Sequence, residues 1–384
     1  MIDVDRRLVP EEFDIGMVHT AWVNVMKDAL GEWIRVPVII ARGAHVRLPL
    51  ARSLTRSRTD SPSFCRLQPG PVFGVTAAVH GNELNGVPCI HRLMLDLDVK
   101  RLNGTVVGVP CVNVVGYARL QRTWSDNQDL NRSFPGKPNG TSSEIFCYYF
   151  FEKIVKCLNW LIDLHTASFG RINSYYIRVD MLDPDQAKMA ELLKPQIILH
   201  NSGQDGTLRG IAAKHGIKAI TVEAGNPQRF QLQIIQWVYS GVRKVLDHYN
   251  IYNIQSGSYE TPLTSKVCKR GFWTYTDTGG MLEVYPRTIA LSHCLSHWHC
   301  IATNENARLS FVSVAVNTYV GKGDLVARVK DIFGNVVKDY YAEEDGVVIG
   351  RSSNPVAVAG SRIIHWGVRM LSPCHSFCFN VQMG

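Results

Sequence analysis

The chain has 384 residues, of which 46% are hydrophobic and 19% charged, and its formal net charge is +8 at pH 7. This length allows one full catalytic domain plus a smaller second domain and exceeds that of a minimal binding module. The basic residues are scattered, with only a short dense group at 47–58, so we do not expect nucleic-acid binding. The sequence has neither an apolar run of eighteen residues nor a signal peptide, which predicts a cytoplasmic protein that does not contact a membrane.

Apolar runs and helical spacings alternate along the first two thirds of the chain. We expect strands at 34–40, 72–79, 104–115, 159–166 and 217–222, and helices at 87–97, 145–158 and 233–249. Short β-rich runs between glycine turns follow at 320–329 and 345–350. The pattern predicts an α/β domain, with a mostly parallel or mixed sheet flanked by helices, followed by a smaller, β-rich C-terminal domain.

Four chemically reactive side chains fall at the ends of three predicted strands. His80 and Glu83 lie three residues apart on a glycine-flanked turn, His165 ends another strand, and Glu223 ends a third. Ligand sites in such sheets lie at the carboxyl ends of the strands. Two histidines and a carboxylate can hold a catalytic zinc ion with one position left for water. We therefore predict one zinc ion per chain at His80, Glu83 and His165, with Glu223 outside the metal shell as the general base.

The loop at 122–136 is rich in hydrogen-bond donors and poor in core residues. Arg132 with Asn131 could hold an acidic group of a substrate, and Arg122 could face the oxyanion. Asp129 could orient a zinc-bound imidazole. The alternative is a capped surface loop with ordinary salt bridges.

The motifs at 80–83, 129–136, 163–166 and 222–225 together resemble those of the succinylglutamate desuccinylase and aspartoacylase family, a branch of the zinc carboxypeptidase superfamily. The resemblance implies a zinc-carboxypeptidase-like fold with a barrel-sandwich-like C-terminal domain. It also implies the zinc ligands and general base given above and substrate-carboxylate binding at Asn131 and Arg132. Arg209 resembles a second substrate-binding arginine, and its alternative is a solvated arginine at a helix start.

The expected organisation is an N-terminal extension at 1–32, a zinc hydrolase domain at 33–252 and a C-terminal β-domain at 253–384. Segments 45–69, 286–314 and 371–384 do not resemble the family and are either insertions or errors of the gene model. The second segment holds five possible metal ligands, for which we favour the reading without a metal: His293, Cys294, His297, His299 and Cys300.

The predicted activity is a zinc-dependent deacylase that cleaves the amide bond of an N-acyl amino acid or a similar small carboxylate. A zinc carboxypeptidase acting on peptides needs the same metal ligands and stays an alternative. A catalytically inactive member of the fold is the other alternative, and a homo-oligomer is possible. The acyl group and the amine are not specified by the sequence, because fold does not fix specificity.

Overall fold

The computed structural model describes residues 2–43, 70–203, 206–254, 264–284 and 315–369. The chain divides into two compact units, which are treated separately below. Unit 1 contains residues 1–169, 175–196 and 201–265, and unit 2 contains residues 170–174, 197–200 and 266–384. In the described ranges, no helix is both long and apolar enough to cross a membrane. The three atypical segments, with the cluster at His293–Cys300, lie outside the described residues.

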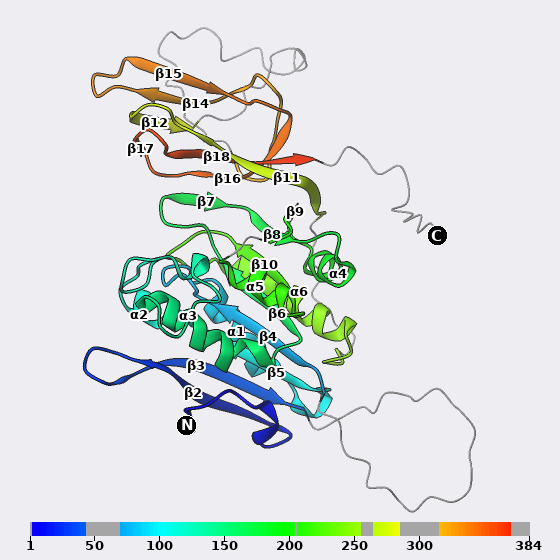
Figure 1. The fold of residues 1–384 in the computed structure, drawn as a ribbon. Coiled ribbons are helices and arrows are strands. Elements are labelled where there is room, and N and C mark those ends of the chain that lie inside the picture. Colours follow the sequence, from blue (N-terminus) through cyan, green and yellow to red (C-terminus); the bar gives the residue numbers. More distant parts are fainter. Residues whose placement is uncertain (1, 44–69, 204–205, 255–263, 285–314, 370–384) are drawn as a thin grey trace, which may run out of the picture. The chain divides into compact units, whose positions relative to one another are not determined.

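Unit 1 is built on a mixed sheet with the strand order β1-β2-β3-β5-β4-β6-β10-β8 (Figure 1). The four neighbours β5, β4, β6 and β10 run parallel, whereas β3 and β8 pair antiparallel on either side of them. The strand bounds are β1 Ile2–Val4, β2 Met17–Lys27, β3 Trp33–Arg42, β4 Val72–Ala77, β5 Thr105–Val109, β6 Trp160–His165, β8 Tyr175–Val179 and β10 Lys218–Ala224. The predicted mixed α/β sheet is confirmed.

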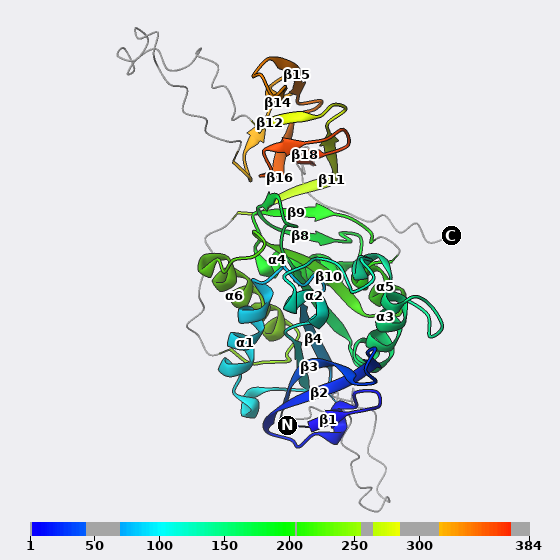
Figure 2. The ribbon, with the colours of Figure 1, turned by 90° about the vertical axis from the view of Figure 1, so that its left-hand side faces the viewer.

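Helices cover both faces of this sheet (Figure 2). On one face α1 (Gly86–Asp96) and α4 (Pro184–Leu193) pack against α6 (Leu232–His248), and α3 (Ser142–Lys153) and α5 (Leu208–Lys214) lie on the other. Every residue of β4 and β5 is buried as a result, which explains their continuous apolar sequences. Helix α3 begins where Thr141 and Glu144 form a reciprocal capping box.

The elements β8, α4 and α5 of unit 1 were not predicted from the sequence, and two further parts differ from the expectation. The strand predicted through residue 115 ends at Val109, because Asn113 accepts a hydrogen bond from the Gly116 amide and caps the short helix α2 (Val114–Ala118). Strands β1 and β2 lie in the segment 1–32, where no strand was predicted. A register shift between Asn24 and Met26 interrupts the two-residue alternation that would reveal β2.

Unit 2 consists of two small sheets. One has the order β9-β11-β18-β16-β13, with β7 also paired to β16, and the other has the order β15-β14-β12-β17. The bounds are β7 Arg171–Asn173, β9 Ile197–His200, β11 Lys266–Tyr275, β12 Gly280–Val284, β13 Tyr319–Val320, β14 Leu325–Lys330, β15 Val336–Tyr341, β16 Gly346–Ser352, β17 Val356–Ala357 and β18 Arg362–Arg369. Their apolar residues, including Leu282, Val326 and Trp366, form one buried cluster. The expected β-rich C-terminal region is confirmed.

Candidate active site

The site lies where the parallel strands β4, β6 and β10 end. After β4, the chain turns through Ala78, whose φ of 52° is in the left-handed region. A Cβ on Gly81 would lie 2.0 Å from the carbonyl carbon of Gly116, so only glycine allows this close passage of two backbones. The turn thus brings His80 and Glu83 over the carboxyl edge of the sheet, next to His165, the last residue of β6.

Three buried side chains converge there. Nδ1 of His80 lies 2.9 Å from Oε1 of Glu83, and Nδ1 of His165 lies 2.9 Å from Oε2 of the same carboxylate. The two Nδ1 atoms are 3.2 Å apart. All three residues are at least 97% buried. Among the described residues, these three form the group of possible metal ligands whose donor atoms lie close enough together to hold one ion.

An aspartate binds Nε2 of each histidine, the ring nitrogen that faces away from the cluster. Nε2 of His80 donates to Oδ1 of Asp129 at 2.9 Å, and Nε2 of His165 donates to Oδ2 of Asp163 at 2.7 Å. Oδ1 of Asp163 in turn accepts from the hydroxyl of Thr76 at 2.7 Å, its register partner on β4. Because a carboxylate only accepts, the ring proton is held on Nε2, and the Nδ1 lone pair of each imidazole points into the cluster.

This arrangement fits a zinc ion. Two Nδ1 lone pairs and a carboxylate face one another, which is unfavourable unless a positive charge lies among them. Tetrahedral zinc with bonds of about 2.0–2.1 Å separates its ligand atoms by about 3.3 Å, close to the observed 2.9–3.2 Å. Two histidines and a glutamate are also a ligand set that catalytic zinc sites use.

The pKa values show the same preference for a cation. Burial alone would lower the pKa of His165, but Asp163 and Glu83 outweigh it and raise that pKa well above its ordinary value. Burial alone would raise the pKa of Glu83, yet His80 and His165 hold it far below its ordinary value. The pocket therefore stabilises a negative carboxylate and attracts positive charge.

Glu223 lies inside β10, one residue beyond the end predicted for this strand at residue 222. It is the register partner of His165 on β6, and partners in a parallel pair share a face of the sheet. Its side chain is buried, and Oε1 lies 3.4 Å from Nη2 of Arg178 on β8. The predicted general base is thus on the same face as the metal cluster.

The loop at 122–136 supplies two further predicted residues to the cluster. Nη1 of Arg122 donates to Oε1 of Glu83 at 2.8 Å and to the Ser168 hydroxyl at 2.7 Å. Its Nη2 donates to Oδ2 of Asp129, also at 2.8 Å. Asp129 therefore joins Arg122 to His80, and burial would raise the pKa of Asp129, but its contacts with His80 and Arg122 hold that pKa well below its ordinary value.

The three predicted substrate-binding residues differ in their hydrogen-bond partners and in their exposure to solvent. Oδ1 of Asn131 accepts from the backbone amide of Leu208 at 2.8 Å, and Arg132 is exposed, with Nη1 donating to the carbonyl of Asn131 at 2.6 Å. Arg209, in the first turn of α5, is buried and donates to the backbone and side-chain oxygens of Asn201 at 2.9 and 2.5 Å. The solvated arginine considered for position 209 is therefore excluded.

Sequence reasoning missed four residues of this site. Asp163 and Thr76 were given no role, although Asp163 lies two residues before His165 and so must share its face of the strand. Arg178 and Tyr176 lie on β8, whose antiparallel pairing with β10 brings them opposite Thr221 and Glu223. The spacing within β6 could have indicated Asp163, whereas the pairing of β8 leaves no local signal.

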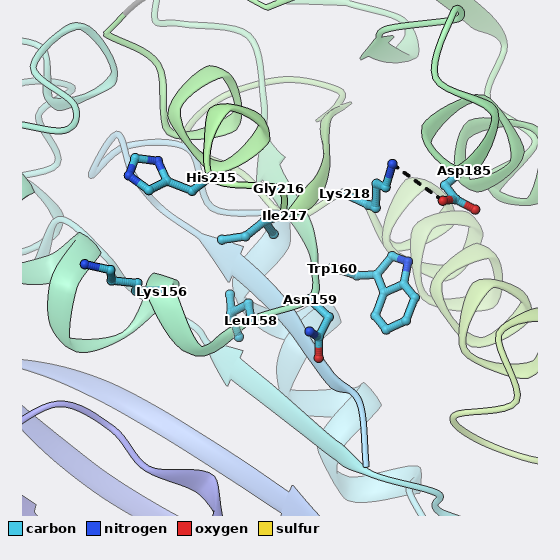
Figure 3. A pocket seen from close by; sticks show the side chains of 9 residues that line it. All are labelled: Lys156, Leu158, Asn159, Trp160, Asp185, His215, Gly216, Ile217 and Lys218. Atoms are coloured by element: carbon cyan, nitrogen blue, oxygen red, sulfur yellow. Dashed lines mark ion pairs between the residues drawn. The ribbon is translucent and has the colours of Figure 1, made fainter. Parts of the chain in front are cut away.

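A separate cavity of about 400 Å³ lies at the opposite end of β6 and β10 (Figure 3). Its polar lining includes Lys156, Asn159, Trp160, Asp185, His215 and Lys218. Lys218, the residue that begins β10, is paired with Asp183 at 2.9 Å and with Asp185 at 3.6 Å. These charges compensate one another, and the cavity takes no part in the cluster described above.

Together, the sheet and its edge define an α/β protein with a candidate metal centre at the carboxyl ends of its parallel strands. Residues 69–249 match the family described as the succinylglutamate desuccinylase/aspartoacylase catalytic domain. The sequence motifs predicted a resemblance to this family, and the match of residues 69–249 agrees with that prediction.

Individual relatives agree with this assignment. An N-alpha-acetyl-L-2,4-diaminobutyric acid deacetylase of Halomonas elongata is 26% identical over 288 residues, which cover 73% of this chain and 78% of the relative. A product-bound structure of the ectoine utilization protein EutE (DoeB) from Ruegeria pomeroyi matches with a TM-score of 0.71 at 19% identity, covering 92% of this chain and 96% of that one. A succinylglutamate desuccinylase/aspartoacylase from Rhodobacter sphaeroides matches with a TM-score of 0.70 at 16% identity, covering 93% and 98%. The structural matches show a shared fold.

Proposed function

We propose that this chain is a zinc-dependent amidohydrolase that removes the acyl group from an N-acyl amino acid. The observation that carries the proposal is the convergence of two Nδ1 atoms and the Glu83 carboxylate, with each imidazole held from behind by an aspartate. The family of residues 69–249 and the deacetylase relative support the choice of an N-acyl amino acid. A diamino acid carrying a small Nα-acyl group is the first substrate to test.

His80, Glu83 and His165 would hold the metal. When bound, zinc supplies a Lewis acid that polarises the amide carbonyl and activates water at neutral pH. Asp129 and Asp163 keep the Nε2 protons in place, so both imidazoles present Nδ1 to the metal. This rigid shell needs no rearrangement when substrate binds.

Glu223 carries the proton transfer in this proposal. Its Oε1 lies 3.4 Å from Nη2 of Arg178. The carboxylate takes a proton from the attacking water and passes it to the nitrogen of the departing amine, which leaves the amino acid and the free acid as products. Arg122, next to Glu83, supplies positive charge for the oxyanion, and Asn131, Arg132 and Arg209 bind the substrate carboxylate.

The test combines a substrate panel with one variant. Zinc-loaded protein is assayed with Nα-acetyl-L-2,4-diaminobutyrate, other N-acetyl and N-succinyl amino acids, and dipeptides, with and without a chelator. We expect amide hydrolysis of an acyl amino acid that a chelator abolishes and zinc restores. Glu223→Gln should lower kcat at least about 100-fold while about one zinc per chain is kept.

Glu191→Gln, at an exposed position of α4, is the matched control and should behave like the wild type. Turnover of Glu223→Gln above one tenth of the wild-type rate would contradict the role of Glu223. Hydrolysis of dipeptides alone would point to a carboxypeptidase instead. Bound zinc without turnover on the whole panel would point to an inactive member of the fold.

A further inference from the structure

Arg178 is a charged residue at the site to which none of the roles above has been given. It lies on β8, where it is the register partner of Thr221, and Tyr176 two residues earlier is the partner of Glu223. Residues two apart on a strand share a face, so Tyr176 and Arg178 point to the same side of the sheet as Glu223 and His165. The antiparallel pairing therefore places a cation next to the proposed general base.

The guanidinium of Arg178 is anchored at two nitrogens. Nε donates to the phenol oxygen of Tyr176 at 3.1 Å, and Nη2 donates to the same oxygen at 2.7 Å. Tyr176 itself is completely buried in the sheet, so this oxygen is a fixed point. Because an arginine side chain otherwise samples many rotamers, two hydrogen bonds to a rigid acceptor determine where its charge lies.

That charge is directed at one oxygen of Glu223. Nη2 of Arg178 lies 3.4 Å from Oε1 of Glu223, whose side chain is buried, whereas the Arg178 side chain is partly exposed. Burial would lower the pKa of Arg178, but Tyr176 and Glu223 outweigh it and raise that pKa, so the guanidinium stays charged. Because the carboxylate partner is buried, water screens this pair less than a pair of two exposed side chains.

Arg178 has a different partner from Arg209, the buried arginine near the site. Arg209 donates to Asn201 instead of to a carboxylate, and burial together with the charge of Arg178 lowers its pKa to about 10. We therefore do not assign substrate-carboxylate binding, the role suggested for Arg209, to Arg178. Arg178 is turned towards the group that moves the proton.

We infer that Arg178 is a positioning residue, anchored by Tyr176, that holds Oε1 of Glu223 and so orients this carboxylate for the proton transfer. The inference rests on the proposed function, because it assigns Arg178 to the proton-transfer step of that reaction. A misplacement of about 1 Å at a reacting group can cost about 100-fold in rate, so an unanchored Glu223 should be a poor base.

The experiment measures kcat and KM for Arg178→Met, Arg178→Lys and Tyr176→Phe on the substrate that the wild type hydrolyses. Arg243→Met is a matched control, since Arg243 on α6 also donates to a tyrosine hydroxyl, that of Tyr239, at 2.8 Å. We expect Arg178→Met to lower kcat about tenfold or more with KM within twofold of the wild type. Arg178→Lys should regain part of the loss, and Tyr176→Phe should lower kcat without raising KM.

Equilibrium binding separates positioning from substrate recognition. In the Glu223→Gln background turnover is slow, so the Kd of the N-acyl substrate can be measured by calorimetry with and without Arg178→Met. We expect the two Kd values to agree within twofold. The Glu223→Gln variant lacks the carboxylate that Arg178 positions, so removing Arg178 should not change substrate binding. A Kd weakened more than fivefold, or a KM raised more than fivefold at unchanged kcat, would overturn the inference in favour of direct substrate binding.

Wild-type kcat in all three variants would also overturn it. If Arg178→Met does not fold, as judged by circular dichroism, Arg178→Lys and Tyr176→Phe decide the question by the same criteria. A wild-type protein without turnover on the whole panel refutes the proposed function and this inference with it. Turnover by the wild type with a KM effect in the variants refutes the positioning role alone.

Discussion

Replacing Asp163 by asparagine should weaken zinc binding about tenfold. The Asp163 side chain is fully buried, and its two oxygens contact Nε2 of His165 and the hydroxyl of Thr76, each at 2.7 Å. An asparagine can keep both contacts, with its oxygen towards His165 and its amide towards Thr76, since a hydroxyl also accepts. The substitution therefore removes the charge while preserving the shape.

The expected magnitude follows from the hydrogen bond to His165. A hydrogen bond to a charged group contributes about 1.5–3 kcal/mol and a neutral one about 0.5–1.5 kcal/mol, so the difference is about 1–1.5 kcal/mol. Since 1.4 kcal/mol corresponds to a factor of ten, zinc affinity should fall about tenfold. This value is at the lower end of the 10- to 100-fold losses typical for residues that orient a metal ligand.

The assay is a competitive titration of metal-free protein with zinc against a chromophoric chelator of known affinity. Asp98→Asn serves as the control, because Asp98 is an exposed residue that accepts from the Lys100 amide before a short 3-10 helix and asparagine caps equally well. A folded Asp163→Asn variant whose zinc affinity stays within twofold of the wild type would refute the argument that Asp163 strengthens His165 as a ligand.

Two further substitutions test the scaffold. Gly81→Ala should lower the free energy of unfolding by at least about 3 kcal/mol and abolish zinc binding, because its Cβ would lie 2.0 Å from the backbone of Gly116. Gly31→Ala is the control: its Cβ would have no atom within 4 Å, so only the φ of +80° should lower the free energy of unfolding, by about 1–2 kcal/mol. Thermal denaturation and metal analysis measure both; equal losses would contradict the close-passage argument. Asp183→Ala should cost about 1–2 kcal/mol at pH 7, because Asp183 caps α4 and pairs with Lys218. Burial would raise the pKa of Asp183, but hydrogen bonds from Gln186 and Lys218 lower it, so its stabilising effect is present above about pH 4 and fades as the pH falls further. Urea denaturation at pH 7 and pH 3 should show the difference narrowing, and a constant difference would contradict the assignment.

Much of the central sheet could be predicted because its strands are buried on both faces. The runs that became β4, β6 and β10 are mostly apolar, and each contains or leads into a residue of the site. The start of α3 was placed three residues too late, although Thr141 and Glu144 carry the spacing of a capping box. The capping residues therefore indicate the start of α3 more accurately than the spacing of apolar residues does.

The residues that were missed depend on long-range pairing. Arg178 and Tyr176 reach the site only because β8 is antiparallel to β10 in one particular register. A shift of that register by one residue would turn both side chains to the opposite face, and no motif around Arg178 fixes it. For the same reason, Thr76 was identifiable only once β4 was known to pair with β6.

The hydrogen bonds between the loop at 122–136 and the start of α5 restrict how the substrate specificity of this protein could be redesigned. Besides the contact of Asn131 with the Leu208 amide, the amide of Phe134 donates to the carbonyl of Gly206 at 3.1 Å. The two segments that carry the proposed substrate contacts are therefore joined to each other by hydrogen bonds, whereas the proposed metal ligands lie on the sheet and its turns. A chimera that imports a new specificity would have to exchange both segments from a single donor, and that donor would also have to supply the arginine and the aspartate that contact Glu83 and His80.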